Sequence, residues 1–272
     1  MKNKKQKHRV KKFIKQDKYC NICEQKHDKL SADHVPLKSC PPKKERFISQ
    51  LRYKLLGDSS FQLRISQSGV KYETICNQCN NNLGSKYDWA LVDLSKKIES
   101  LTNSNIILPD SFEIECYPNA IIRSVLGHLL AAKTITDKSI IDSLIRPCIL
   151  DESIPIDKNI HVFYWIYPYD KIIILRDVGM PSIRNKLTSE ICIFSIIKFF
   201  PIAFLVTYQL DKYENLQNLY QFNNLSIKDK ANLQINLKNI KKATWPEECI
   251  GFENFLLIGQ SFDDSVYSVP RK

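Results

Sequence analysis

The chain has 272 residues, enough for one large domain or two modest ones with an apolar core. Its seven glycines and twelve prolines exclude a disordered, collagen-like or repeat protein. It carries 40 Lys and Arg against 29 Asp and Glu, so we expect a basic globular protein with a formal net charge of +11.

Membrane spans and targeting signals are not indicated by the apolar pattern. The longest apolar run, residues 191–208, is interrupted by Lys198 and Pro201, so it predicts two buried strands and no membrane span. Residues 1–18 have neither the apolar centre nor the cleavage site of a secretory signal. We therefore expect a cytoplasmic protein without a membrane partner.

The positive charge is concentrated at the beginning of the chain. Residues 1–100 hold 22 Lys and Arg against 10 Asp and Glu, whereas residues 101–272 hold 18 against 19. A basic face attracts polyanions, so this distribution favours DNA or RNA as a partner. For residues 1–18, a basic arm, the alternative is a solvated tail that only improves solubility.

Two C-x-x-C pairs follow the arm, Cys20 with Cys23 and Cys76 with Cys79, separated by 52 residues. Disulfides are rare in a reducing compartment, and four thiolates are what a closed tetrahedral zinc site needs. We therefore predict a structural Zn²⁺, which leaves no open position for catalysis. A redox pair is the alternative for one C-x-x-C alone, and His27 is a less favoured substitute ligand.

Between and after these pairs the pattern changes several times. Residues 47–55 predict an amphipathic helix, and residues 61–65 and 71–75 predict short strands. Apolar residues then recur at spacings of three and four from Leu83 to Leu94, which predicts one strong helix beginning near Cys79.

A polar segment, residues 102–111, suggests a boundary between two domains, 19–105 and 110–272. Beyond it we predict a buried helix at 117–134 and strands within 161–177, 191–208 and 251–262. The fold class is therefore α+β, with a mixed helix and antiparallel-sheet accessory domain at the C-terminal end. Residues 110–272 carry no catalytic motif, and regulation, dimerisation and target selection remain open as their role.

Asp33 and His34 supply the parts of a hydrolytic centre. An imidazole near pKa 6.5 can take a proton from water, and a carboxylate can hold a hard divalent cation. Pro36 breaks the strand after them, so both side chains can serve one site. Asn80, at the start of the predicted helix, offers a neutral oxygen ligand for the same ion.

The order C-x-x-C, "DHVP" and "CNQCNNNLGSKYD" resembles the HNH (ββα-metal, His-Me finger) endonuclease family. It is most similar to the zinc-stapled endonuclease VII-like branch and to uncharacterised bacterial HNH proteins with a C-terminal extension. The resemblance covers residues 20–90. It implies a small zinc-stapled ββα-metal domain at the N-terminal end.

For the site, the resemblance implies that His34 is the general base and that Asp33 and Asn80 bind a catalytic Mg²⁺ or Mn²⁺. The reaction is then phosphodiester hydrolysis, most readily of DNA, and relatives of this kind suggest bacterial anti-phage defence or a mobile element. A second copy of the chain or a defence-system protein is the partner that this context implies. Four basic side chains could contact phosphates or could simply be solvated: Lys38, Lys43, Lys44 and Arg46.

Two features depart from the family pattern. Many members carry an asparagine before the second cysteine pair, where this chain has "VKYETIC", and a histidine where it has Asn80. Asp88 lies on roughly the same helix face as Asn80 but about 12 Å further along a straight helix, too far to share one ion unless the backbone bends. We therefore favour a surface helix aspartate there. His128 and His161 are predicted to have packing or capping roles.

Two further functional hypotheses remain open. The first is a non-catalytic, zinc-dependent nucleic-acid-binding protein in which Asp33 and His34 are structural. The second places the function in residues 110–272, which would sense a ligand or a partner.

Overall fold

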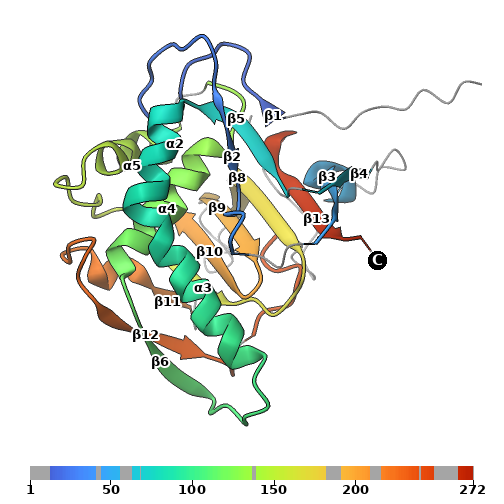
Figure 1. Cartoon of the computed structure of the whole chain (residues 1–272), viewed down its shortest axis with the longest axis vertical. Coiled ribbons are helices and arrows are strands. Elements are labelled where there is room, and N and C mark those ends of the chain that lie inside the picture. The colour runs from blue at the N-terminus through green and yellow to red at the C-terminus, as the bar shows by residue number, and fades with distance from the viewer. Residues whose placement is uncertain are drawn as a thin grey trace, which may run out of the picture.

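An eight-stranded sheet forms the body of the molecule, and helices pack in front of it in the view of Figure 1. The computed structural model describes residues 13–40, 44–55, 63–67, 69–136, 139–181, 191–208, 216–238, 240–247 and 263–271. Over these residues the fold is mixed α+β, as predicted. None of the helices among them has the length and apolar character that crossing a membrane requires.

Neighbouring strands of the large sheet are antiparallel throughout. The predicted strands within 161–177 and 191–208 are confirmed, whereas the predicted strand at 251–262 lies outside the described residues. In spatial order, the strands are β11 (Gln217–Asn218), β7 (His161–Ile166), β10 (Ile202–Thr207), β9 (Ile191–Phe199), β8 (Ile172–Pro181), β13 (Val266–Pro270), β3 (Arg46–Gln50) and β4 (Arg64–Ser66).

The central strands are buried on both faces, which explains their continuous apolar sequences. Successive strand residues point to opposite faces. On β7, Tyr164 packs in the larger apolar cluster with the helices, whereas Phe163 and Trp165 pack in a second cluster.

The cysteine-bearing part of the chain forms a separate three-stranded sheet in the order β1 (Phe13–Ile14), β5 (Lys71–Ile75), β2 (Ser31–His34). A helical run follows β5 directly and confirms the predicted helix. It consists of α2 (Asn77–Leu83), a π-helical turn η1 (Gly84–Asp88) and α3 (Trp89–Thr102). The π-helical turn was not predicted.

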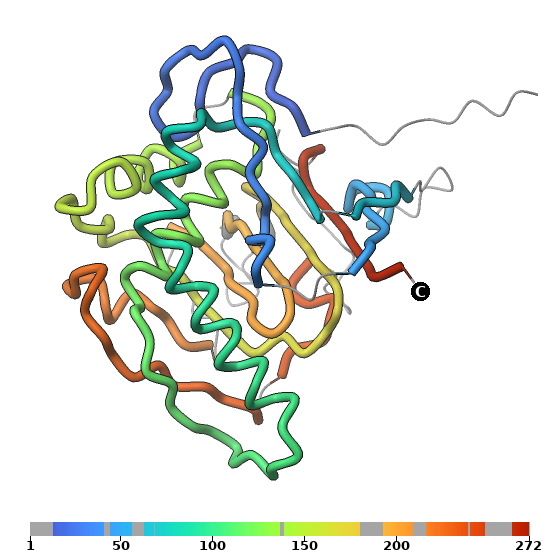
Figure 2. Tube along the Cα trace, viewed as in Figure 1, coloured from blue at the N-terminus to red at the C-terminus, as the bar shows by residue number. Residues whose placement is uncertain are grey.

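The segment between the two cysteine pairs joins the large sheet. Residues 46–50 form β3, between β13 and β4, so the predicted helix through Phe47 is wrong there; only Leu51–Leu55 is helical, as α1. Pairing with β13 outweighs the local helical periodicity, because tertiary context overrides weak propensity. Figure 2 shows this blue segment beside the red C-terminal strand.

The predicted buried helix is α4 (Pro118–Ala131), and every residue of it is buried. Residues on both sides of 102–111 enter the same apolar core. The division into two domains remains a prediction, but the two parts pack together. The other elements near α4 are α5 (Ile140–Leu150), the 3₁₀ turn η2 (Leu219–Phe222) and a two-stranded sheet of β6 (Ser111–Cys116) and β12 (Ala231–Asn236).

α4 approaches the helical run closely at Gly127. A Cβ atom at this position would lie 2.4 Å from Cδ2 of Leu83, which is itself buried. An alanine at this position would therefore require the buried Leu83 side chain to shift.

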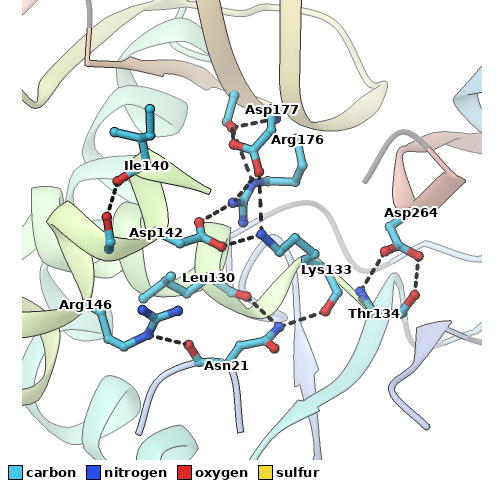
Figure 3. Close-up of polar contacts among 12 residues, drawn as sticks. Asn21, Leu130, Lys133, Thr134, Ile140, Asp142, Arg146, Arg176, Asp177 and Asp264 are labelled. Carbon is cyan, nitrogen blue, oxygen red and sulfur yellow. Dashed lines mark hydrogen bonds and ion pairs between the residues drawn. The ribbon is translucent and has the colours of Figure 1, made fainter. Parts of the chain in front are cut away.

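The C-terminal end of α4 is held by buried polar contacts (Figure 3). The Asn21 amide donates hydrogen bonds to the carbonyl oxygens of Leu130 (2.9 Å) and Lys133 (2.7 Å). The Lys133 ammonium and the Arg176 guanidinium both contact the Asp142 carboxylate, each at 2.5 Å. These contacts connect α4 to α5, to β8 and to the first cysteine pair.

Replacing Asp142 by Asn should strongly destabilise the protein at neutral pH. Burial alone would raise the pKa of Asp142, but Arg176 and Lys133 outweigh burial and lower the pKa. We expect Asp142→Asn to reduce the free energy of unfolding by about 3 kcal/mol at pH 7 in denaturant titrations, because two buried cations lose their closest carboxylate and keep only Asp177, which lies 3.2 Å from Arg176 and 3.6 Å from Lys133.

The effect should depend on pH. The folded-state pKa lies below the unfolded value of about 3.9, so the stabilisation is present above that pH and is lost as the pH falls through the folded-state pKa. The difference between wild type and Asp142→Asn should therefore shrink below about pH 4. Asp93→Asn is the control, because the exposed Asp93–Lys97 pair should contribute less than about 0.5 kcal/mol. Equal effects of the two substitutions would contradict this account.

Candidate active site

The four paired cysteines gather at one point. Their sulfur atoms lie within 4.8 Å of one another, and the sulfurs of Cys23 and Cys76 are 3.9 Å apart. Four sulfurs bound to zinc at 2.3 Å in a tetrahedron would be about 3.8 Å apart. The cluster could therefore bind a metal such as zinc.

Backbone N–H groups point at these sulfurs. Cys20 Sγ accepts hydrogen bonds from the backbone of Cys76 (3.3 Å) and Ile22 (3.4 Å), and Cys76 Sγ accepts one from Cys79 (3.4 Å) at the start of α2. A hydrogen bond from the Cys79 side chain and these backbone groups lower the pKa of Cys20 to about 4, despite its burial. His27 lies beside the cluster, with Nε2 3.6 Å from Cys23 Sγ, but the four sulfurs form a complete set without it.

The three residues predicted for catalysis line one cleft. Asp33, His34 and Asn80 border an open depression of about 390 Å³. Antiparallel pairing of β2 with β5 places Asp33 and His34 at the end of β2, and α2 brings Asn80 to the same place. The remaining residues that line the cleft are Ala32, Leu37, Lys38, Ser39, Gly84, Asp88, Trp89 and Val92.

Asn80 is oriented by a neighbour on β2. Its Nδ2 donates a hydrogen bond of 2.8 Å to Ser31 Oγ, so this contact uses the nitrogen of the amide and not its oxygen. The Asp33 side chain is 4% exposed, whereas His34 is half-buried at the cleft. The arrangement combines an imidazole, a carboxylate and an amide side chain around one open cleft.

His128 and Asp88 belong to the same cluster, and the sequence did not identify them. His128 Nδ1 lies 2.7 Å from Asp33 Oδ2, and Nε2 lies 3.0 Å from Asp88 Oδ1. Ser124 Oγ donates a hydrogen bond of 2.7 Å to the same Asp88 oxygen. Burial alone would lower the pKa of His128, but the two carboxylates outweigh it and hold the pKa well above its ordinary value.

Asp88 is not the surface residue that the helical pattern predicts. In a straight α-helix, residues eight apart differ in direction by about 80°. The wider π-helical turn η1 takes up part of this rotation and returns Asp88 to the face that carries Asn80. The Asp88 side chain is only 14% exposed. His128, a histidine within the apolar sequence of α4, was the one feature of the sequence that could have indicated a polar partner for Asp88.

The four basic residues predicted for phosphate contacts have different positions. Lys38 lines the cleft, and Lys43 lies outside the described residues. Lys44 is exposed and lies 3.3 Å from the Asp170 carboxylate. Arg46 is not on a binding surface, because it is 2% exposed and donates hydrogen bonds to Asp170 (2.8 Å) and Ser268 (3.1 Å).

Comparisons of the chain with protein-family models, with curated proteins and with solved structures find no match. Residue chemistry and geometry alone therefore bear on the function.

The cysteine cluster predicts a definite metal content. We expect purified protein to carry one zinc ion per chain by elemental analysis, and Cys76→Ser to lose that ion together with the fold around β2, β5 and α2. Cys148→Ser is the matched control, because this buried thiol donates to the Ile145 carbonyl and serine can do the same. Wild-type protein without zinc, or Cys76→Ser with its full content, would disprove the assignment.

Proposed function

We propose that the protein is a metal-dependent HNH-type endonuclease that hydrolyses phosphodiester bonds in DNA. The observation that carries this proposal is the meeting of His34, Asp33 and Asn80 in one open cleft, with Asn80 directly after Cys79 of the four-cysteine cluster. The antiparallel pair of β2 with β5, followed by α2, supports the proposal, and β3, α1 and β4 lie between β2 and β5 in the chain. The excess of positive charge in residues 1–100 favours a polyanionic substrate.

Zinc at the four cysteines would have a structural role, because four thiolates leave no position for a substrate. It would hold the 20–23 turn against the start of α2, and through them the two walls of the cleft.

The cleft also suits a second, harder cation. Hydrogen bonds occupy one oxygen of Asp33 and the nitrogen of the Asn80 amide, so Asp33 Oδ1 and Asn80 Oδ1 are the atoms that would hold it. Carboxylate and amide oxygens are ligands that Mg²⁺ and Mn²⁺ favour. When bound there, the ion supplies stabilisation of the negative charge that develops on the phosphate and the leaving oxygen.

The remaining chemistry belongs to the side chains. The His34 imidazole accepts a proton from the attacking water as general base, since its ordinary pKa lies near neutral pH. Asp33 and Asn80 would act on the phosphate through the cation that they hold, because a carboxylate alone repels a phosphate. Lys38, at the edge of the same cleft, contributes a positive charge toward the DNA backbone.

The second candidate is a non-catalytic, zinc-dependent nucleic-acid-binding protein. The observation that favours it is the ion pairing of Asp33 with His128, which a purely structural carboxylate would also make. The two functions differ in whether His34 is needed after the nucleic acid has bound.

Substitution of His34 separates these two functions. We expect wild-type protein to nick supercoiled plasmid with Mg²⁺ or Mn²⁺, and His34→Gln to cut at least about 100-fold more slowly, because a glutamine side chain cannot accept the proton. DNA affinity, measured by fluorescence anisotropy without added divalent ion, should be the same for both proteins.

His161→Gln provides the matched control. It makes the same exchange at a buried histidine of β7 that contacts Asn218 and does not line the cleft. Its cutting rate should stay within about two-fold of wild type. Full cutting by folded, zinc-loaded His34→Gln protein would eliminate the endonuclease and leave the binding protein.

A further inference from the structure

We infer that His128 is a positioning residue of the cleft, supplied by the second half of the chain, and that it fixes the Asp33 carboxylate in the orientation needed to bind a divalent cation. This inference rests on the proposed function. It assigns a task in the site to α4, an element outside residues 20–90.

Both nitrogens of the His128 ring are engaged. Nδ1 faces Asp33 on β2 and Nε2 faces Asp88 in η1, at 2.7 and 3.0 Å, and the ring is 2% exposed. Each ring nitrogen therefore lies at hydrogen-bond distance from a carboxylate oxygen of a different element. The ring therefore joins three elements that are distant in sequence: β2, η1 and α4.

This bridge fixes how the carboxylate is turned. One oxygen of Asp33 is held from the interior by the ring, so the other oxygen is the one available to an ion in the cleft. Residues that hold the ligands of a metal in this way set ligand orientation and basicity, and their loss typically costs about 10–100-fold in metal affinity or activity.

The ring itself has little freedom to move. α4 is buried along its whole length and meets Leu83 at Gly127, the residue next to His128. Figure 3 shows the Asn21 side chain directed at the end of α4, where it binds the carbonyl oxygens of Leu130 and Lys133. Asn21 lies between Cys20 and Cys23, so the cysteine cluster also helps to place the helix that carries His128.

A contribution to stability alone does not explain why His128 is buried between Asp33 and Asp88. Buried ionic groups are often no more stabilising than well-packed apolar residues of similar volume. Both carboxylates that face the ring, Asp33 and Asp88, line the cleft, whereas His128 lies behind them, and this is the arrangement that an orienting role requires.

The experiment compares His128→Gln with wild type and with His161→Gln, using full-length zinc-loaded protein. Free Mn²⁺ is measured by electron paramagnetic resonance to obtain Mn²⁺ affinity, and plasmid nicking is followed as a function of Mn²⁺ concentration. These data separate the half-saturating Mn²⁺ concentration from the maximal rate. Thermal melting and zinc content report on the fold.

Glutamine can donate to one of the two carboxylates but cannot bridge both. We expect His128→Gln to weaken Mn²⁺ binding about 10–100-fold and to raise the half-saturating concentration for nicking to the same extent. His161→Gln should stay within about two-fold of wild type in both, whatever its melting temperature. If His128→Gln does not fold, Ser124→Ala, which removes one bond to Asp88 and leaves the ring, should shift Mn²⁺ affinity in the same direction.

Two results would overturn the inference, and they are distinct. In the first, the wild type binds Mn²⁺ and nicks DNA, and a folded His128 or Ser124 variant has the same Mn²⁺ affinity. His128 would then be a packing residue, and the proposed function would remain. Wild type that neither binds Mn²⁺ nor nicks DNA would remove the proposed function, and the inference with it.

Discussion

The contact between four sulfur atoms from two distant turns is the constraint on which the rest of the structure depends. Cys23 and Cys76 are 53 positions apart, yet their sulfurs are 3.9 Å apart. A shared metal would close this long loop, which otherwise carries a large entropic cost of ordering. It would fix the start of α2 against the 20–23 turn. β2 begins shortly after Cys23, and β5 ends directly before Cys76. Bringing the cysteine pairs together therefore also brings these two strands together at the cleft.

The loop closed in this way is part of the main body of the protein. Its strands β3 and β4 extend the large sheet beyond β13, while Tyr72 of β5 donates a hydrogen bond of 2.6 Å to the Asp264 carbonyl. Thr74 of β5 donates to the carbonyl of Ala131 at the end of α4. The C-terminal half of the chain therefore packs against β5, the strand that pairs with β2 at the cleft. This gives the accessory residues a physical connection to the proposed chemistry that a separate domain would lack.

The sequence was informative wherever one local signal decides the structure. C-x-x-C spacing predicted which sulfurs converge, and β-branched and aromatic runs predicted the buried strands at 161–177 and 191–208. The neighbouring Asp33 and His34, with Asn80 after the second cysteine pair, predicted three residues that line one cleft.

The failures have a common physical cause. Phe47 was assigned to a helix because its local periodicity suits one, but its conformation is set by pairing with Val269, more than 200 residues away. Asp88 and His128 were missed because their partners are set by tertiary packing, and the π-helical turn that redirects Asp88 has no clear local signature. No local pattern reports that a histidine in an apolar helix faces two carboxylates from other elements.

Anomalous X-ray diffraction from crystals soaked in Mn²⁺ tests the central claim most directly, because it locates each metal independently of any activity. Data at the zinc edge should show one ion among the sulfurs of the four cysteines. Data sensitive to manganese should show one ion in the cleft, about 2.1 Å from an oxygen of Asp33 and from the amide oxygen of Asn80. An empty cleft at saturating Mn²⁺, or manganese bound only away from Asp33, would contradict the account.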